Sequence, residues 1–353
     1  MKNISWWKNF NFLNDKKNIS DLFNKFDNKK NYIKILEKKL SNILKVKYVV
    51  FTTSGSSALT IALRAFPLKL NSKILIPDRT WVATAHAAYN NGHKVLIEDS
   101  NDFNMNFDYT KKNLYKKKKF DAAILVNLNG KNCEFEKINS SKKVYIIEDC
   151  AQSFLSFRKK KLPHDHISCF STGTTKLMNT FQGGFCTTNS KSLYQKLLLI
   201  RNHGVYDNLT DSWCMPGFNL KPTNLQCFIG IDEIKNIWAK RRKCIEINNL
   251  YLKKLDSKKI NIISKNYSDG EFPLYVQALV NNKKNFIEYM KKNKIQIRSL
   301  PPSISSANYL YKKKNERQFE NSNNFFKKGV FLPCGPSQKI NNIKKVIKVI
   351  NKY

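Results

Sequence analysis

The sequence predicts an α/β fold in which a mostly parallel sheet is covered by helices and is followed by a smaller α+β domain. Short apolar runs alternate with amphipathic helical patterns. These runs are apolar on both faces, as the strands of a buried parallel sheet are. The chain has 353 residues, which is more than one hydrophobic core usually supports. We therefore expect an arm and a large domain at residues 1–235, and a connector helix with a small domain at residues 236–353.

The first thirty residues are polar with scattered apolar positions, including Trp6 and Trp7, and are expected to form an arm or short helix that packs on another element. Beyond them, apolar residues three or four positions apart predict helices, and short apolar runs that end in turn residues predict strands. The predicted helices of the large domain cover residues 32–44, 56–66, 84–92 and 192–204. The predicted strands cover residues 48–55, 73–78, 94–99, 121–130, 143–152, 166–173 and 183–189.

The pattern changes after about residue 235. A long amphipathic pattern predicts one connector helix between the domains, and shorter elements follow it. The elements predicted here are the helix at 233–255, a strand at 274–280, a helix at 284–294, a strand at 295–300 and a helix at 340–353.

The net charge of +37 allows two interpretations. It could mark a nucleic-acid binder, which predicts strongly salt-dependent binding to DNA. However, the lysines recur along the whole chain beside Asn and Ile, as an AT-rich genome would produce. We favour this compositional origin and expect no nucleic-acid partner. The densest basic run, from Lys111 to Lys119, is the place where a functional patch would lie.

The eight cysteines are scattered singly, without the paired spacing of a zinc site, so no metal is expected. The basic start lacks the apolar core of a signal peptide. No apolar run approaches the ~18 residues of a membrane span. These features predict a cytoplasmic protein with free thiols and no membrane partner.

The turn at Thr53–Leu59 follows a predicted strand and opens a helix, with Gly55, Ser56 and Ser57 at its start. Unpaired N–H groups at such a helix end suit a phosphate. The alternative is a plain helix cap, which uses the same residue types.

Asp149 ends another predicted strand, so its carboxylate is expected at the carboxyl edge of the sheet. A buried carboxylate needs a cationic partner, which a protonated pyridine nitrogen would provide. Gln152 could bond another edge of the same ring. Alternatively, Asp149 caps the next helix.

Lys176 lies in a loop of small residues between two predicted strands, with Ser171 before it and the Gly183–Gly184 pair after it. A lysine that forms a Schiff base needs such a crowded, desolvated site; an ordinary loop lysine is the alternative. Trp81, which follows a predicted strand, could stack on a flat ring or belong to the core.

In this order and spacing, the segments resemble the DegT/DnrJ/StrS sugar aminotransferases, which are fold-type I pyridoxal-phosphate (PLP) enzymes. The resemblance runs from about Glu37 to the C-terminus. The matching segments are TSGSSAL, IPDRTWVATAHAAYNNG, IIEDCAQSF, CFSTGTTK with GGFCTTN, IRNHG, PGFNLKPTNLQCFIGI and FLPCGPS. The resemblance implies the PLP-transferase type I fold.

The resemblance also implies roles for individual residues. Lys176 would bind the cofactor covalently and shuttle a proton. Asp149 would hold the ring nitrogen, Gln152 the ring hydroxyl, and Trp81 the ring face. The phosphate would bind at Gly55, Ser56, Ser57 and Ser171, and Asn219 and Lys221 would reach it from a partner subunit.

The reaction that the resemblance implies moves an amino group, with glutamate as the expected donor, to a nucleotide-linked keto-sugar of the 4-amino-4,6-dideoxy-sugar type, in a homodimer with shared sites. Lys221 and Arg298 are the predicted substrate residues. Related enzymes dehydrate the sugar instead, with a His in place of the lysine, and a non-catalytic protein of this fold is a further alternative. Lys176 disfavours the dehydratase, and the intact trio of Lys176, Asp149 and Gln152 disfavours the non-catalytic protein.

Overall fold

A computed structural model describes residues 3–9, 20–21, 23–101, 105–106, 120–133, 144–157, 165–207, 212–310 and 316–353. The basic run at 111–119 lies outside the described residues. Among the described helices, none is long and apolar enough to cross a membrane. The same residues contain no cluster of His, Cys, Asp or Glu suited to a metal ion.

The large sheet has the strand order β1-β7-β6-β5-β4-β2-β3. Its parallel pairs are β2 with β3, β2 with β4, β4 with β5, and β5 with β6, whereas β7 runs antiparallel to both of its neighbours. The strands are β1 (Tyr48–Thr52), β2 (Lys73–Pro77), β3 (Lys94–Glu98), β4 (Ala122–Val126), β5 (Tyr145–Asp149), β6 (Ile167–Ser171) and β7 (Gly184–Thr188). All seven predicted strands of the large domain are thus confirmed, in a mostly parallel sheet.

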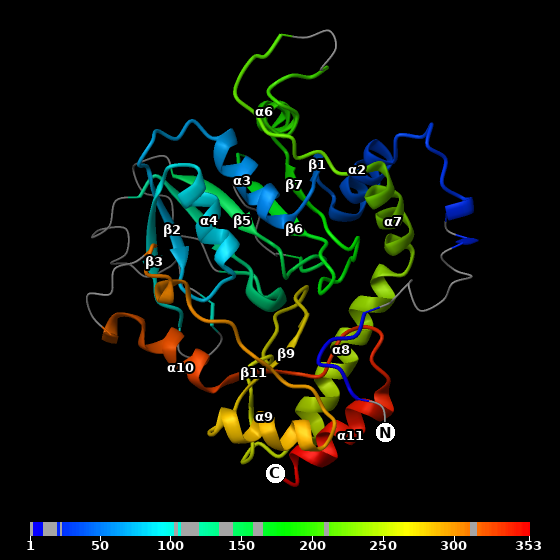
Figure 1. Ribbon diagram of the computed structural model, residues 1–353, viewed down its shortest axis with the longest axis vertical. Coiled ribbons are helices and arrows are strands. Elements are labelled where there is room, and N and C mark those ends of the chain that lie inside the picture. The colour runs from blue at the N-terminus through cyan, green and yellow to red at the C-terminus, as the bar shows by residue number, and fades with distance from the viewer. Residues whose placement is uncertain are drawn as a thin grey trace.

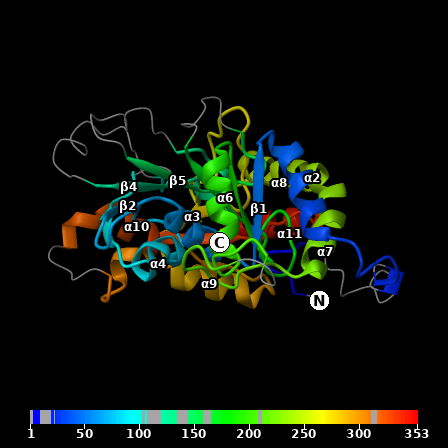
Figure 2. The ribbon, with the colours of Figure 1, turned by 90° about the horizontal axis from the view of Figure 1, so that it is seen from above.

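Helices pack along this sheet as the amphipathic patterns predict. Figure 1 shows α3 (Gly55–Ala65) beside α4 (Val82–Asn90), and α6 (Lys191–Arg201) packs against α3, β1 and β7. Seen from above, α2 (Tyr32–Leu44) and α7 (Asn224–Lys235) lie together beside β1 at one end of the sheet (Figure 2).

The second sheet is antiparallel, with the strand order β10-β11-β9-β8. Its strands are β8 (Asn261–Ile262), β9 (Val276–Leu279), β10 (Arg298–Ser299) and β11 (Gly329–Leu332). The helices of this part are α8 (Ile237–Lys254), α9 (Lys283–Lys292), α10 (Glu320–Lys328) and α11 (Ile340–Ile350). One hydrophobic cluster includes buried residues of both sheets, such as Phe185 and Val276. The division into domains at residue 235 stays a prediction.

The prediction of one connector helix at 233–255 is wrong at its beginning, because two helices meet there. The chain breaks at Asn236, whose φ of −109° and ψ of 8° are not helical, and this residue separates α7 from α8. Helix α7 begins at a capping box, in which Thr223 accepts from the N–H of Gln226 and the Gln226 side chain accepts from the N–H of Thr223. The Thr-x-x-Gln spacing could have predicted this start.

The predicted strand at 295–300 is also shorter than expected, with only Arg298–Ser299 in the sheet. Ile295, the first residue of the predicted run, instead forms a parallel bridge with Ile4 of the N-terminal arm. A second bridge joins Trp7 to Cys334. The arm therefore packs on the second sheet of its own chain.

Candidate active site

A pocket of about 820 Å³ lies between the carboxyl ends of the large-sheet strands and the second sheet. Parallel sheets bind ligands at this edge, because loops from several strands converge there. The structure brings eight predicted site residues to this pocket: Gly55, Ser56, Trp81, Asp149, Gln152, Ser171, Lys176 and Arg298. These residues come from five separate segments of the chain. Their functional roles remain predictions, but their convergence is a property of the fold.

Asp149 ends β5 with a side chain that is almost completely buried. One carboxylate oxygen accepts from the Thr84 hydroxyl at 2.8 Å, and the other accepts from the N–H of Ala151 at 3.0 Å. Burial raises the pKa of Asp149, whereas the charge of Lys176 lowers it. Within the described residues no lysine or arginine forms an ion pair with it. The described residues 150–157 form turns and contain no helix, so Asp149 does not cap a helix there.

Gln152 has its carboxamide fixed by the backbone of a neighbouring turn. Its oxygen accepts from the N–H of Asn129 at 2.9 Å, so its NH2 group is the part left to donate into the pocket. Asn129 has a left-handed φ of 51°. Its side chain accepts from the N–H of Tyr275 at 2.7 Å and donates to Gln277 Oε1 at 2.9 Å. The second sheet thus helps to position Gln152.

The start of α3 forms a narrow cradle at the pocket. Ser54 caps the helix, with its hydroxyl accepting from the N–H of Ser57. A Cβ at Gly55 would lie 2.7 Å from Ser171 Cβ, and a Cβ at Gly184 would lie 2.5 Å from Gly55 N. The two glycines therefore let the helix end approach Ser171 closely. The structure thus shows the helix cap. A cap leaves other N–H groups of the first turn free, so the predicted anion site stays compatible with it as a prediction.

Ser57 does not line the pocket. Its hydroxyl instead lies 2.8 Å from Ser54 Oγ and 2.9 Å from Thr53 Oγ1, within the helix cap. The Ser57 hydroxyl is thus already hydrogen-bonded within the cap. Its contact with a phosphate stays a prediction. Ser56, by contrast, is exposed at the pocket.

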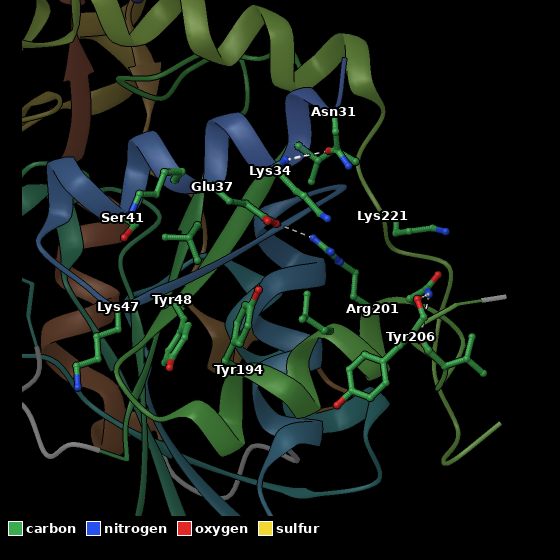
Figure 3. A pocket seen from close by; sticks show the side chains of 16 residues that line it. Asn31, Lys34, Glu37, Ser41, Lys47, Tyr48, Tyr194, Arg201, Tyr206 and Lys221 are labelled. Carbon is green, nitrogen blue, oxygen red and sulfur yellow. Dashed lines mark hydrogen bonds and ion pairs between the residues drawn. The ribbon is translucent and has the colours of Figure 1, made fainter. Parts of the chain in front are cut away.

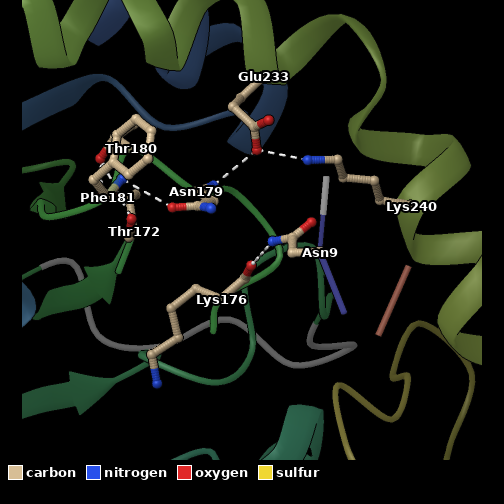
Figure 4. A network of polar contacts seen from close by, with 8 residues as sticks. All are labelled: Asn9, Thr172, Lys176, Asn179, Thr180, Phe181, Glu233 and Lys240. Carbon is tan, nitrogen blue, oxygen red and sulfur yellow. Dashed lines mark hydrogen bonds and ion pairs between the residues drawn. The ribbon is translucent and has the colours of Figure 1, made fainter. Parts of the chain in front are cut away.

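The loop that carries Lys176 is held at both ends (Figure 4). Asn9 of the arm donates to the Lys176 carbonyl at 2.9 Å, and Tyr275 Oη donates to the Thr175 carbonyl at 3.0 Å. Further along, a carboxylate oxygen of Glu233 accepts from the N–H of Asn179 at 2.9 Å and from Lys240 Nζ at 2.6 Å. Figure 4 shows the Lys176 amine pointing away from these contacts. The half-buried lysine lines the pocket, unlike an ordinary exposed loop lysine.

Trp81 and Arg298 supply two exposed faces of the pocket. Trp81 immediately precedes α4 and is 57% exposed, so its assignment to the core is wrong. The guanidinium carbon of Arg298 lies 4.9 Å from the ring centre of Trp6, which also lines the pocket. An exposed indole can cover a flat ligand, and a guanidinium can bind an oxyanion.

Asn219 and Lys221 lie outside this pocket. Asn219 is bridged to Asn202, and Lys221 lines a separate hollow of about 530 Å³ (Figure 3). In that hollow Arg201 pairs with Glu37 at 2.8 Å. Neither predicted residue therefore lines the pocket of its own chain. If the two residues contact a cofactor, they have to do so from a partner subunit.

Sequence reasoning missed several residues of the pocket. Trp6, Asn127 and Tyr275 line it, and Asn129 supports it from behind. The paired tryptophans were a visible signal, because a polar arm rarely carries two large aromatic residues without a packing partner. The asparagines and Tyr275 carried no local signal.

A family model for the DegT/DnrJ/EryC1/StrS aminotransferase family matches residues 15–351. The chain belongs to this family. Its members are pyridoxal-phosphate-dependent aminotransferases, so the predicted family, enzyme class and cofactor are confirmed.

Two relatives illustrate the match. The chain is 27% identical to the UDP-4-amino-4,6-dideoxy-N-acetyl-beta-L-altrosamine transaminase of Campylobacter jejuni subsp. jejuni serotype O:23/36 (strain 81-176), over 88% of this chain and 86% of that protein. It is 28% identical to the GDP-perosamine synthase of Escherichia coli O157:H7, over 65% of this chain and 64% of that protein. The second match thus spans less than two thirds of the relative.

Solved structures confirm the fold. The structure of S. venezuelae DesV in complex with a ketimine intermediate has a TM-score of 0.89 at 15% identity, covering 100% of this chain and 98% of that one. Helicobacter pylori PseC, an aminotransferase involved in the biosynthesis of pseudoaminic acid, has a TM-score of 0.87 at 20% identity, covering 99% of both chains. At these identities the likeness shows the predicted PLP-transferase architecture alone.

The pocket residues fit the cofactor of the family. Asp149 is a buried carboxylate that forms no ion pair among the described residues, which suits a protonated ring nitrogen. The close approach of Gly55 and Ser171 leaves a helix N-terminus open to a phosphate. Lys176 supplies the amine between them. The donor set therefore matches a cationic ring, an aldehyde and a phosphate.

Proposed function

We propose that this protein transfers an amino group from glutamate to a nucleotide-linked keto-sugar of the 4-amino-4,6-dideoxy-sugar type, for a surface glycan or a secondary metabolite. The observation that carries the proposal is that the buried carboxylate of Asp149 and the amine of Lys176 line one pocket. The printed names of the relatives, a UDP-linked amino-sugar transaminase and a GDP-perosamine synthase, support the substrate class.

When bound, pyridoxal phosphate supplies an electron sink that stabilises negative charge at a neighbouring carbon. Lys176 would hold it covalently through Nζ and move a proton with the same amine. Asp149 would keep the proton on the ring nitrogen, because a buried carboxylate favours a cation beside it. Gln152 would donate its NH2 group to the ring hydroxyl, and Trp81 would exclude water from one ring face.

The phosphate would bind at the start of α3. The helix N-terminus offers unpaired N–H groups, and the hydroxyls of Ser56 and Ser171 add donors. At the opposite side of the pocket, the exposed guanidinium of Arg298 would bind an anionic part of the substrate.

A homodimer with shared sites is part of this proposal. Asn219 and Lys221 lie outside the pocket of their own chain, and the loop near them exposes large aromatic side chains: Tyr206, Trp213 and Phe218. Such a surface suits a second subunit. A cytoplasmic location is also proposed, since seven of the eight free cysteines are buried thiols without a disulfide.

A sugar dehydratase is the alternative within this fold. One solved structure with a TM-score of 0.83 is the E coli GDP-4-keto-6-deoxy-D-mannose-3-dehydratase with bound hydrated PLP, at 21% identity over 99% of this chain and 100% of that one. A dehydratase of this fold is expected to carry a His at the position of Lys176, so we favour amino transfer.

The test is the visible absorbance of the purified protein with pyridoxal phosphate, before and after glutamate. We expect a visible band that Lys176→Ala removes and that glutamate shifts to shorter wavelength. Lys292→Ala, which changes an exposed lysine of α9, is the matched control and should keep the band. A wild-type protein without the band contradicts the proposal. A band that glutamate leaves unchanged, together with loss of water from a keto-sugar substrate, would favour the dehydratase.

A further inference from the structure

The N-terminal arm, residues 3–9, is held along the second sheet on both sides of Trp6. Ile4 bridges to Ile295, and Trp7 bridges to Cys334. The N–H of Trp6 also donates to Gln296 Oε1 at 3.2 Å. The Trp6 carbonyl accepts from the N–H of Cys334 at 2.8 Å. The backbone of Trp6 is therefore fixed by contacts with residues 290 or more positions away in the sequence.

The Trp6 side chain is packed between the second sheet and the active-site pocket. Its ring centre lies 6.1 Å from that of Tyr275 and 5.5 Å from that of Phe331, and all three side chains line the pocket. Tyr275 in turn donates to the Lys176 loop through its hydroxyl. The indole thus belongs to a packed aromatic wall rather than to a loose terminus.

Arg298 lies against this wall, with its guanidinium carbon 4.9 Å from the Trp6 ring centre. Among the described residues, no Asp or Glu forms an ion pair with Arg298, and its side chain is exposed. A guanidinium stacked on an indole keeps its edge N–H groups available, and these form two parallel bonds to a planar oxyanion. Stacking also restricts its rotamers before the ligand arrives, which lowers the entropy lost on binding.

We propose that Trp6 is a positioning residue that holds Arg298 as the oxyanion receptor of this pocket. The inference rests on the proposed function, in which two anionic substrates enter the same pocket in turn. The ligand chemistry is a carboxylate or phosphate oxyanion, supplied either by the amino donor or by the diphosphate of the sugar nucleotide. The same arm reaches the Lys176 carbonyl through Asn9, so it sets the receptor in a fixed relation to the reactive amine.

The test compares Trp6→Leu, Trp6→Phe and Arg298→Ala with the wild type in the holoenzyme. Binding of UDP and GDP is measured by calorimetry, and binding of glutamate by titration of the visible band. We expect Trp6→Leu to weaken one of these ligands by about 3- to 30-fold, the loss of a cation–π contact. Trp6→Phe should recover most of that loss, because a phenyl ring keeps a stacking face.

Coupling separates a positioning role from general damage to the pocket. In the Arg298→Ala background, Trp6→Leu should cause no further loss of ligand affinity, because Trp6 acts through the guanidinium. Trp238→Leu is the matched control, since this indole is 43% exposed and stacks on Phe157 away from the pocket. Thermal unfolding of each variant identifies any that fails to fold.

The outcomes identify the ligand or overturn the inference. A loss confined to glutamate assigns the receptor to the carboxylate of the donor, and a loss confined to UDP or GDP assigns it to the diphosphate. Unchanged binding of all probes, or additive losses in the double variant, overturns the inference. A wild type that binds none of the probes also overturns it. Failure of the proposed function is seen separately, as a missing visible band in the wild type. In that case the binding of UDP and GDP still tests the role of Trp6.

Discussion

Replacing Lys240 with methionine should cost the protein about 3–5 kcal/mol of unfolding free energy, because it leaves a buried carboxylate without its cation. The Lys240 and Glu233 side chains are 9% and 3% exposed, and their charged atoms lie 2.6 Å apart. After Lys240→Met, the N–H of Asn179 at 2.9 Å is the one donor among the described residues that still bonds to Glu233. One neutral N–H cannot replace the solvation of a buried carboxylate.

The magnitude is checked by urea unfolding of four proteins: the wild type, Lys240→Met, Glu233→Gln, and the double variant. A glutamine keeps an oxygen that can accept from the N–H of Asn179 and carries no charge. The double variant should therefore be more stable than Lys240→Met alone, by most of the ~3–5 kcal/mol. A cost below about 1 kcal/mol for Lys240→Met, or a double variant no better than that single variant, would refute the reasoning.

Three further results are expected. Burial raises the pKa of Asp149, so the folded protein holds this proton more tightly than the unfolded chain. The folded protein therefore loses stability as pH rises from about 4 through the raised pKa. In thermal unfolding without cofactor, the melting temperature of Asp149→Asn should match or exceed that of the wild type at pH 7, and that advantage should vanish below about pH 4. Gly55→Ala places a Cβ 2.7 Å from Ser171 Cβ and should lower cofactor affinity by about tenfold or more in an equilibrium titration, whereas unchanged affinity would show that the cradle tolerates the methyl group. Asn129→Ala leaves the buried N–H of Tyr275 without its partner and should cost about 1–3 kcal/mol in urea unfolding, a value that a cost near zero would contradict.

The parts of the site that the sequence predicted share one property: their signal is local. Asp149 and Gly55 follow apolar runs, so a strand end could be read directly from the chain, and the sheet then placed both at one edge. Lys176 stood out because small residues surround it between two strands. Periodicity and turn chemistry act over a few residues, and these features require no more than that.

The parts that were missed depend on contacts between distant segments. Asn129 reaches Tyr275 across 146 positions, and nothing near either residue indicates this pairing. β8 and β10 have two residues each, too few to show an alternating pattern. No proline or glycine lies beside the break at Asn236, so the predicted run at 233–255 gave no sign that two helices meet there.

The bridge between Trp7 and Cys334 has a consequence for the order of folding. During synthesis the arm emerges before the large sheet, yet Cys334, to which Trp7 bridges, lies more than three hundred residues later. The large sheet can form from β1 to β7 during synthesis, whereas the aromatic wall of the pocket has to wait for β11. Closing so long a loop slows folding more than it weakens the final structure. The wall of the pocket is thus completed only after β11 has left the ribosome.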